Sequence, residues 1–479
     1  MVSIRRIFKN STWMMASQTI TNLCAFVWTI LMARYLGTSD FGILSFAISL
    51  STVVGVLMDS GTQTYIVRAI SKDYNLTERY FEKTVPLKVV LSVLIIMGTV
   101  LFLILTGRSD SVVNVSFIML CQYAFLSMNG FFYGIFQAYE KMEYQSIASA
   151  LNAVVLLVIV FLTIYLNLGL YGMAFGYLIA MFCAFLYIYS KIGNLNFRPH
   201  YNFDYGFSKE LLKAALPFGL TGIFYSIYFT IDMTMLQYLA TNAAVGMYNA
   251  SYKIVSLITT FYALYPQVIF PVMVKLFEDS ADLLKFSYER SMKYLLLIIL
   301  PICAGVILYA EPLMTLIYGS QYAGSGMIVM VLMFTIPFLF VNGASTVAMN
   351  SSNNEVLVTK IYCVAAIVNV VLNLLLIPHY SYLGAAFATV ISEIIISILM
   401  FRVTLKTEYA PGWIVVKDIV KLLIATIVMY MVLDYLKVNM FAGIVLGAII
   451  YIVMIFAERT LDDKDKNIIK IILNKKQDY

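Results

Sequence analysis

Charged residues are scarce in this chain: they make up 12% of its 479 residues, while hydrophobic residues make up 61%. Soluble domains carry about 25% charged residues, and the mean hydropathy of +0.87 also points to a lipid environment. Histidine (two residues) and cysteine (five) are rare, and no two cysteines form a CxxC pair. We therefore exclude a soluble enzyme, a nucleic-acid-binding protein and a secreted disulfide scaffold, and we expect no metal site and no cofactor.

Long apolar runs dominate the sequence instead. A spanning helix needs about 20 apolar residues, and the runs predict an all-α polytopic membrane protein of about 14 transmembrane helices. The first run is too long for the apolar region of a signal peptide and is followed by no convincing cleavage site, so we expect a first transmembrane helix. The expected limits are 12–34, 41–66, 85–106, 113–137, 145–166, 170–190, 211–239, 245–273, 294–314, 326–349, 356–377, 382–403, 415–436 and 439–457.

The distribution of positive charge predicts the orientation. Cytoplasmic loops hold the excess of Lys and Arg, and with the N-terminus inside only Arg34, Arg108 and Lys437 fall outside, while Lys253 falls within a span. We expect a multi-pass protein of the cytoplasmic membrane with both termini in the cytoplasm. The net charge of +6 then reflects topology, and no nucleic-acid partner is expected.

Two short similarities indicate an internal repeat. Residues 33–42 resemble residues 236–246, and residues 171–176 resemble residues 383–388. Six helices per copy is an even number, so the copies would be parallel and related by an axis along the membrane normal. The expected organisation is an N-terminal six-helix lobe (1–193), a cytoplasmic linker (194–209), a C-terminal six-helix lobe (210–406), a terminal transmembrane pair (407–457) and a cytoplasmic tail (458–479).

Several of these motifs resemble a known family. Residues 33–42, Asp59-Ser60-Gly61, Arg68, the segment Pro301–Gly319 and residues 383–393 are similar to the Wzx-type oligosaccharide-lipid flippases of the multidrug/oligosaccharidyl-lipid/polysaccharide exporter superfamily. The resemblance implies translocation of undecaprenyl-diphosphate-linked oligosaccharide repeat units to the outer leaflet, by alternating access around a central cavity that is often cationic. The implied partners are the lipid-linked oligosaccharide, the bilayer, and a polysaccharide polymerase and glycosyltransferases.

Two other functions stay open. One is a cation-coupled antiporter of drugs or amphiphiles from the same superfamily, and the other is a non-catalytic membrane partner of a polysaccharide assembly complex. An enzyme is not expected, because the outer loops are short and no glycine-rich phosphate-binding loop is present. The acidic run 462–465 is interpreted as a solvated tail, and the isoleucines that follow it as a helix on the membrane surface.

Charges inside spans are costly and mark candidate functional residues. Lys253 is a candidate phosphate contact, and Asp232 on the preceding span is either its structural ion-pair partner or its counter-ion in an empty cavity. Glu393 is either a coupling site for H⁺ or Na⁺ or a neutral acid hydrogen-bonded to a neighbouring helix. For Asp59 we expect a structural role, as a cap or as a partner of Arg68.

The remaining candidates are cations, tyrosines and prolines. We expect Arg34 either to anchor lipid headgroups or to contribute to the charge of the cavity. We expect Arg68 either to anchor the inner end of the second predicted span or to receive the diphosphate at the inner mouth of the cavity. Deep tyrosines suit either packing or sugar contacts, and prolines in the second lobe suit bendable helices. These tyrosines are Tyr225, Tyr228 and Tyr252, and the prolines assigned a structural or gating role are Pro217, Pro301 and Pro337.

Overall fold

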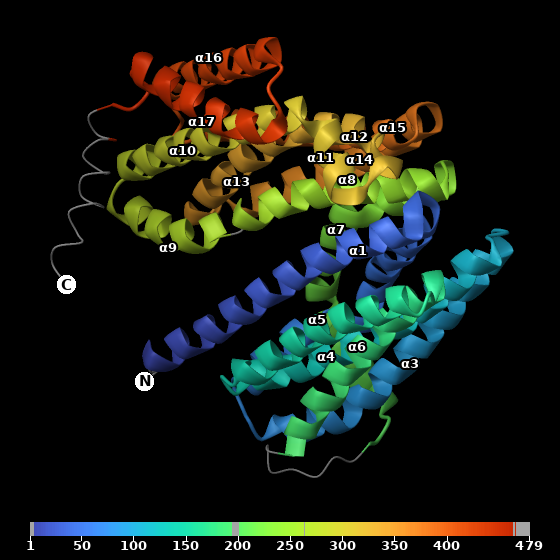
Figure 1. The fold of residues 1–479 in the computed structure, drawn as a ribbon. Coiled ribbons are helices and arrows are strands. Elements are labelled where there is room, and N and C mark those ends of the chain that lie inside the picture. Colours follow the sequence, from blue (N-terminus) through green and yellow to red (C-terminus); the bar gives the residue numbers. More distant parts are fainter. Residues whose placement is uncertain (1–3, 194–200, 263, 463–464, 466–479) are drawn as a thin grey trace. The chain divides into compact units, whose positions relative to one another are not determined.

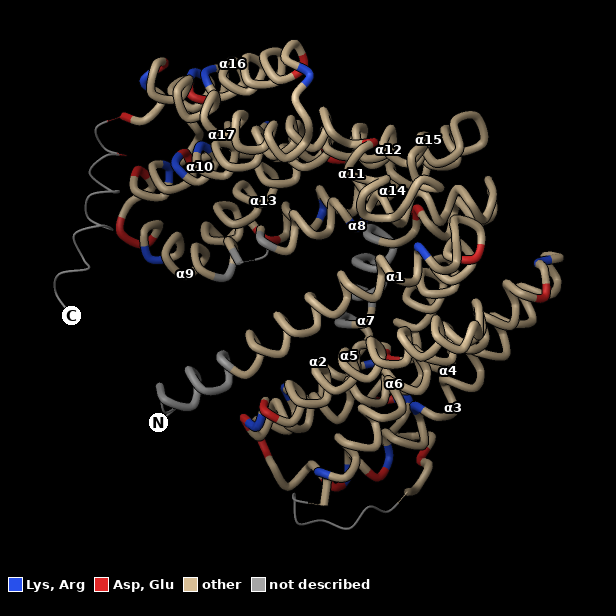
Figure 2. The backbone as a smooth tube through the Cα atoms, viewed as in Figure 1, with Lys and Arg blue, Asp and Glu red and all other residues tan. Residues whose placement is uncertain are grey.

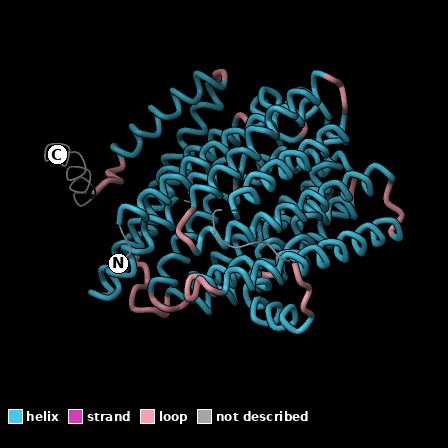
Figure 3. The backbone as a smooth tube through the Cα atoms, turned by 90° about the horizontal axis from the view of Figure 1, so that it is seen from below, coloured by secondary structure: helices cyan, strands magenta, loops and turns pink. Residues whose placement is uncertain are grey.

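The computed structural model describes the backbone of residues 4–193, 201–262, 264–462 and 465. Side chains are described from residue 13 onward within these ranges, except at 217, 218, 220–229, 261, 264 and 267. Every regular element in this described part is a helix, and the connections are short (Figure 3). The all-helical membrane fold expected from the sequence is confirmed.

The first of two compact units comprises Met1–Asn249. Its longest element, α1, is interrupted at Gly37, where φ is 74° and ψ is 179°. A positive φ is a conformation that glycine adopts at little cost, so this residue separates the first two predicted spans. The helices are α1 (Ile4–Asp59), α2 (Thr62–Ile70), α3 (Leu76–Leu105), α4 (Asp110–Ala138), α5 (Met142–Tyr165), α6 (Gly169–Ile192), α7 (Tyr205–Leu239) and the start of α8 (Asn242–Tyr262).

The second unit comprises Ala250–Tyr479. Its last two helices, α16 and α17, pack against each other and against α10 (Figure 1). Its elements after α8 are α9 (Leu264–Asp279), α10 (Ala281–Leu308), α11 (Ala310–Tyr318), the short 3₁₀ helix η2 (Ser320–Tyr322), α12 (Ser325–Met333), α13 (Thr335–Ser351), α14 (Glu355–Tyr380), α15 (Tyr382–Thr404), α16 (Trp413–Leu436) and α17 (Met440–Ala457).

The predicted spans correspond to these helices. In the described residues, 11 helical stretches are long and apolar enough to cross a membrane, and the first, Trp13–Ile70, contains the Gly37 break and two predicted spans. The two predicted spans that remain, 211–239 and 245–273, correspond to α7 and to α8 with α9. The chain is thus a multi-pass membrane protein, while the predicted lobe boundaries and the orientation stay predictions.

Matching glycines explain one of the two sequence similarities. Gly172 and Gly384 occupy the same place in the α5–α6 and α14–α15 hairpins, just after the turn. A Cβ at Gly384 would lie 2.4 Å from the carbonyl oxygen of Leu376 in α14, and a Cβ at Gly172 would lie 2.7 Å from the Cγ2 of Thr163 in α5. Only a residue without a side chain permits this approach of consecutive helices, so packing requires glycine at both positions.

The helix α7 begins at Tyr205, inside the predicted linker 194–209. Asp204 caps the helix by accepting a hydrogen bond from the backbone N–H of Phe207 at 3.0 Å, and it pairs with Lys83 of α3 at 2.6 Å. The hydrogen bond from Lys83, together with that from Phe207, holds the pKa of Asp204 below its usual value. Residues 194–200 of the linker lie outside the described part of the chain.

Candidate functional site

Lys253 lies midway along α8, within the predicted span 245–273, and its side chain is nevertheless exposed. It follows Asn242, the first residue of α8, by 11 residues, which is about 16 Å along the helix axis. The first part of α8 is largely buried, whereas Lys253, Leu257 and Thr260 are exposed. Their spacing of four and three residues places them on one helix face. A lysine in contact with hydrocarbon is costly, so this face is suited to a water-filled cavity.

Asp232 is buried near the end of α7, in the first unit. It accepts a hydrogen bond of 2.9 Å from the hydroxyl of Tyr248, which is also buried. The sequence predicted a pair of Asp232 and Lys253; Asp232 lies in the first unit and Lys253 in the second, and the predicted pair stays a prediction. Tyr248 is the partner that sequence reasoning missed, although it lies six residues beyond the turn between the two helices.

Glu393 is buried midway along α15 and is held by a neighbouring helix. The side-chain amide of Asn342 in α13 donates to the Glu393 carboxyl at 2.7 Å and to its backbone carbonyl at 3.1 Å. Ser397 donates in turn to the amide oxygen of Asn342 at 2.6 Å. These hydrogen bonds from another helix fit the structural interpretation of this acid.

Asp59 pairs with Lys88, where the sequence suggested Arg68. Lys88 lies in α3 with its side chain fully buried, and its ammonium donates to Asp59 at 2.8 Å and to Ser127 at 2.9 Å. Arg68 is exposed in the last turn of α2. The predicted orientation assigns Lys88 to the inner positive charges, but it is the fourth residue of the predicted span 85–106. A carboxylate within reach removes much of the cost of burying this cation.

The remaining candidate residues lie on α1, α7 and α8. Arg34 is exposed one turn before the Gly37 break, and Tyr252 is half-buried beside Lys253. Tyr225, Tyr228 and Pro217 fall within α7, but their side chains lie outside the described residues.

Prolines coincide with irregular helices at only some positions. Pro337 lies in the first turn of α13, directly after the break that separates α12 from α13. Proline is tolerated in a first turn, because the N–H that it lacks has no partner within the helix there. Pro301 lies inside α10, which continues as one helix from Ala281 to Leu308. Sequence alone did not distinguish these two cases.

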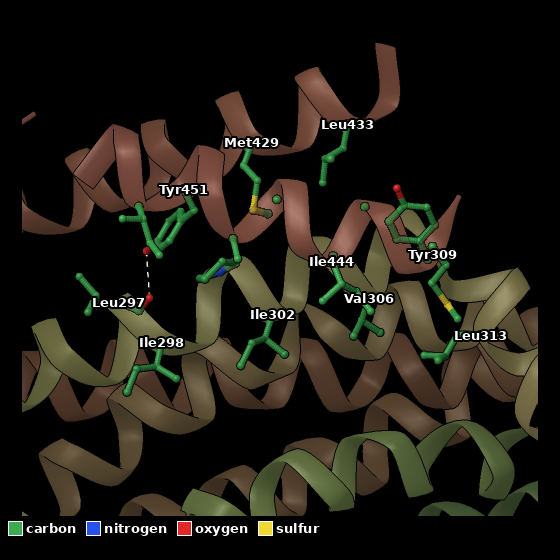
Figure 4. A pocket seen from close by; sticks show the side chains of 17 residues that line it. Leu297, Ile298, Ile302, Val306, Tyr309, Leu313, Met429, Leu433, Ile444 and Tyr451 are labelled. Carbon is green, nitrogen blue, oxygen red and sulfur yellow. Dashed lines mark hydrogen bonds between the residues drawn. The ribbon is translucent and has the colours of Figure 1, made fainter. Parts of the chain in front are cut away.

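An apolar cavity of about 480 Å³ lies in the second unit (Figure 4). Its walls come from α10, α11, α16 and α17, and the lining includes Pro301, Leu313, Met429, Ile444 and Tyr451. A Cβ added at Gly305, which also lines it, would meet no atom within 4 Å. A groove of this composition between membrane helices suits a hydrocarbon chain.

The interpretation of the acidic run 462–465 as a solvated tail is wrong for Asp465. Asp465 is fully buried and binds Arg290 at 2.6 Å and Lys293 at 2.7 Å, while Asp462 binds Arg290 as well. Lys293 also pairs with Asp418 of α16 at 3.1 Å. Asp462 and Asp465 thus pair with cations of α10 that the sequence assigned to an inner loop. The isoleucines after the run lie outside the described residues. Figure 2 shows charged residues gathered at the ends of α10 and α16.

These five side chains tie the segment after α17 to α10 and α16. We call them the tail clamp: Arg290, Lys293, Asp418, Asp462 and Asp465. Burial raises the pKa of Asp462, but the hydrogen bond from Arg290 outweighs it and lowers that pKa to about 2. A carboxyl with a lowered pKa stabilises the fold above its ordinary pKa, and this contribution is lost as the pH falls toward 2.

We expect Asp465→Asn to destabilise the protein by about 3 kcal/mol, because it leaves the buried Lys293 and the partly buried Arg290 with one partner fewer each. Thermal unfolding of the purified protein in detergent measures this, with Asp434→Asn, at an exposed carboxylate of α16, as the matched control. In the unchanged protein, the contribution of Asp462 to the free energy of unfolding should stay constant from neutral pH down to about pH 4, the ordinary pKa of a carboxyl group. Equal unfolding temperatures for the two variants would contradict a structural clamp.

Relatives of this chain cover nearly its whole length. It is 21% identical to the capsular polysaccharide biosynthesis protein CapF of Staphylococcus aureus, over 81% of this chain and 96% of that protein. It is 20% identical to the probable low-salt glycan biosynthesis flippase Agl15 of Haloferax volcanii, over 92% of this chain and 94% of that protein. It is 22% identical to a putative O-antigen transporter of Shigella flexneri, over 82% and 96%.

Solved structures with the same fold are also membrane transporters. The lipid II flippase MurJ, in an inward closed conformation, matches with a TM-score of 0.78 at 15% identity, over 94% of this chain and 99% of that one. An inward-facing multidrug resistance transporter of the MATE family matches with a TM-score of 0.64 at 16% identity, over 80% and 93%. At these identities the likeness concerns the fold alone.

The family itself is identified by a profile match over more than half of the chain. Residues 7–277 match the family described as polysaccharide biosynthesis protein. The match includes α1 with its Gly37 break, the Asp59–Lys88 pair and the face of α8 that carries Lys253. The chain is a member of the polysaccharide biosynthesis protein family, with the fold of the MurJ and MATE transporters.

Proposed function

We propose that the protein is a flippase that moves undecaprenyl-diphosphate-linked oligosaccharide repeat units from the inner to the outer leaflet of the cytoplasmic membrane. The observation that carries this proposal is the exposed Lys253 in the interior of α8, in a chain of this family. Relatives described as a glycan flippase and as an O-antigen transporter support it. The protein would be a transporter and not an enzyme, and the polymerase and glycosyltransferases of surface polysaccharide assembly would be its partners.

Lys253 provides what a diphosphate needs within a bilayer. A fixed ammonium forms charge-assisted hydrogen bonds with phosphate oxygens, and the exposed face of α8 leaves it open to a substrate. Tyr252 is adjacent and presents an aromatic ring and a hydroxyl, both of which suit a sugar. Arg34 and Arg68, exposed near opposite ends of their predicted spans, would attract the diphosphate where it leaves and enters, and the side chain of Asp232 would balance the cations of the empty site.

The apolar groove supports a lipid-linked substrate over a free sugar. Its lining is almost entirely hydrocarbon (Figure 4). Gly305 and Gly447, which also line it, contribute no side chain to its wall. A prenyl chain would gain about 25 cal/mol for each Å² of apolar surface removed from water, but little when it moves there from lipid. The groove would therefore guide the chain and contribute less to affinity than the diphosphate contact does.

We expect Lys253→Ala to reduce translocation of a fluorescent polyprenyl-diphosphate oligosaccharide in proteoliposomes by about 10-fold or more. Loss of a hydrogen bond to a charged group costs about 1.5–3 kcal/mol. Lys253→Arg keeps the charge and should restore a large part of the rate, and Lys360→Ala removes an exposed lysine near the start of α14 as the matched control.

A different result would favour another function. Equal loss in Lys253→Ala and Lys360→Ala would contradict a phosphate contact. Gradient-driven efflux of cationic dyes without any translocation of prenyl-linked sugar would identify a drug antiporter. Polysaccharide assembly that continues in cells after loss of both Lys253 and Glu393 would favour the non-catalytic partner.

We further propose that Glu393 couples translocation to an ion gradient of H⁺ or Na⁺. The acid is buried at mid-helix, and its contacts with Asn342 come from a different helix. A change in its charge would alter the hydrogen bonds between α13 and α15, so an ion taken up there would act directly on helix packing.

We expect Glu393→Gln to abolish the acceleration of translocation by an imposed pH or sodium gradient while downhill translocation persists. Glutamine keeps the shape and can still bind Asn342, but it carries no charge and takes up no proton. The measurement compares initial rates with and without each gradient, using Glu355→Gln, at an exposed acid in the first turn of α14, as the control. Retained gradient dependence in Glu393→Gln would exclude this residue as the coupling site.

A further inference from the structure

Tyr262 connects three helices of the second unit. It is the last described residue of α8, and its ring packs against Phe340 of α13 and Tyr265 of α9, with centroid distances of 4.7 and 5.9 Å. A Cβ added at Gly343 of α13 would overlap the hydroxyl group of Tyr262. The hydroxyl therefore occupies a notch in α13 that exists only because residue 343 has no side chain.

This notch lies beside the buried acid of α15. Gly343 directly follows Asn342, whose side-chain amide donates to the Glu393 carboxyl at 2.7 Å. Glu393 interacts electrostatically with the hydroxyl of Tyr262 and also with that of Tyr362 in α14. All five residues belong to the second unit. The charge of Glu393 thus acts on a side chain of α8 as well as on α13 and α14.

The electrostatic contact between Glu393 and Tyr262 differs between the two charge states of the acid. In surroundings of low dielectric constant a carboxylate attracts the hydrogen of a hydroxyl group strongly. A carboxyl group that has taken up a proton or a sodium ion attracts it much less. The packing of the Tyr262 ring does not depend on charge, so the two states differ in how firmly the hydroxyl is held in its notch. An ion can shift a conformational equilibrium only through such a difference.

Pro266, near the start of α9, favours a change of helix direction beside Tyr262. It lies four residues after Tyr262 and has no N–H to donate to the Tyr262 carbonyl, and helices bend at such positions. The helix α9 itself packs against α10 and α13. Lys253 precedes Tyr262 by nine residues, about 14 Å along the helix axis. A small change in angle at Tyr262 would therefore move Lys253 while α9 stays in place.

We propose that Tyr262 is a positioning residue for ion coupling, which transmits the charge of Glu393 to α8 and thereby to Lys253. The inference rests on the proposed function, because it supplies the step between ion uptake at Glu393 and the contact of Lys253 with the substrate. When the acid takes up its ion, the Tyr262 hydroxyl loses its attraction to the carboxylate, and the end of α8 is released from α13. When the ion leaves, the hydroxyl returns to the same notch, because Gly343 leaves room for it there.

The movement of α8 can be measured without substrate. In a variant with the five native cysteines replaced, spin labels at Leu257→Cys of α8 and Ile298→Cys of α10 report the distance between two exposed positions. In proteoliposomes this distance should change between about pH 9 and about pH 5, the range over which buried carboxyl groups titrate, or on addition of sodium. Glu393→Gln should abolish the change. Tyr262→Phe, which removes only the hydroxyl, should reduce it at least about 5-fold, because contacts with a charged group are stronger than contacts between neutral groups.

Two controls separate this contact from general packing. Tyr265→Phe removes the hydroxyl of the ring that stacks on Tyr262 and interacts with Tyr288 of α10, and it should leave the distance change intact. Gly343→Ala fills the notch and should act like Tyr262→Phe. Gly98→Ala is its matched control, because a Cβ there meets no atom within 4 Å.

A distance change of equal size with Tyr262 in place and in Tyr262→Phe, or no change in either, would overturn the proposal. A change that requires both Tyr262 and Glu393, in a protein that translocates no prenyl-linked glycan, would leave the contact in place and refute the proposed function alone.

A double-mutant cycle provides the complementary test during transport. Tyr262→Phe and Glu393→Gln should each reduce the acceleration of translocation by an imposed gradient, and the double variant should reduce it no further than the stronger single variant. Losses that add would mean that Tyr262 acts independently of Glu393, which would overturn the proposal.

Discussion

The cost of placing charge in hydrocarbon is the constraint on which this structure depends. Moving an ion out of water costs several kcal/mol even after relaxation, so each buried charge needs a partner. Lys88 meets this need with Asp59 and Ser127, and Glu393 with Asn342. Lys253 meets it differently, by exposure on one face of α8. This difference is what distinguishes a residue suited to substrate from residues that hold helices together.

The same constraint organises the helix ends of the second unit that lie near the segment after α17. Arg290 and Lys293 belong to a helix that continues into the membrane, and the tail clamp neutralises them with carboxylates from α16 and from the segment after α17. The clamp therefore fixes the terminal pair against α10 near the apolar groove, which is lined by α10, α16 and α17. The helix α10 therefore takes part in both features, because it carries the cations of the tail clamp and also lines the apolar groove.

The fold was largely predictable from the sequence, because bilayer thickness restricts span length and hydropathy reports it directly. Glycine was informative as well, since Gly37 lies at the break between the first two predicted spans. Partners were less predictable. The Asp59–Lys88 pair joins residues 29 positions apart on different helices, and nothing in the local sequence favours Lys88 over Arg68. The acidic run 462–465 has the composition of a solvated tail, and only folding brings it to Arg290 and Lys293.

The most direct test of the central claim measures binding of the substrate in two parts. Native mass spectrometry of the purified protein can compare a prenyl-diphosphate oligosaccharide with a long prenyl chain against one with a short chain. Gly305→Leu fills the apolar groove, and Gly98→Leu adds the same side chain at the open position in α3. A lipid-linked substrate predicts that Gly305→Leu weakens binding of the long-chain ligand alone. Equal binding of both ligands by both variants, or no binding of either diphosphate lipid to the unchanged protein, would contradict it.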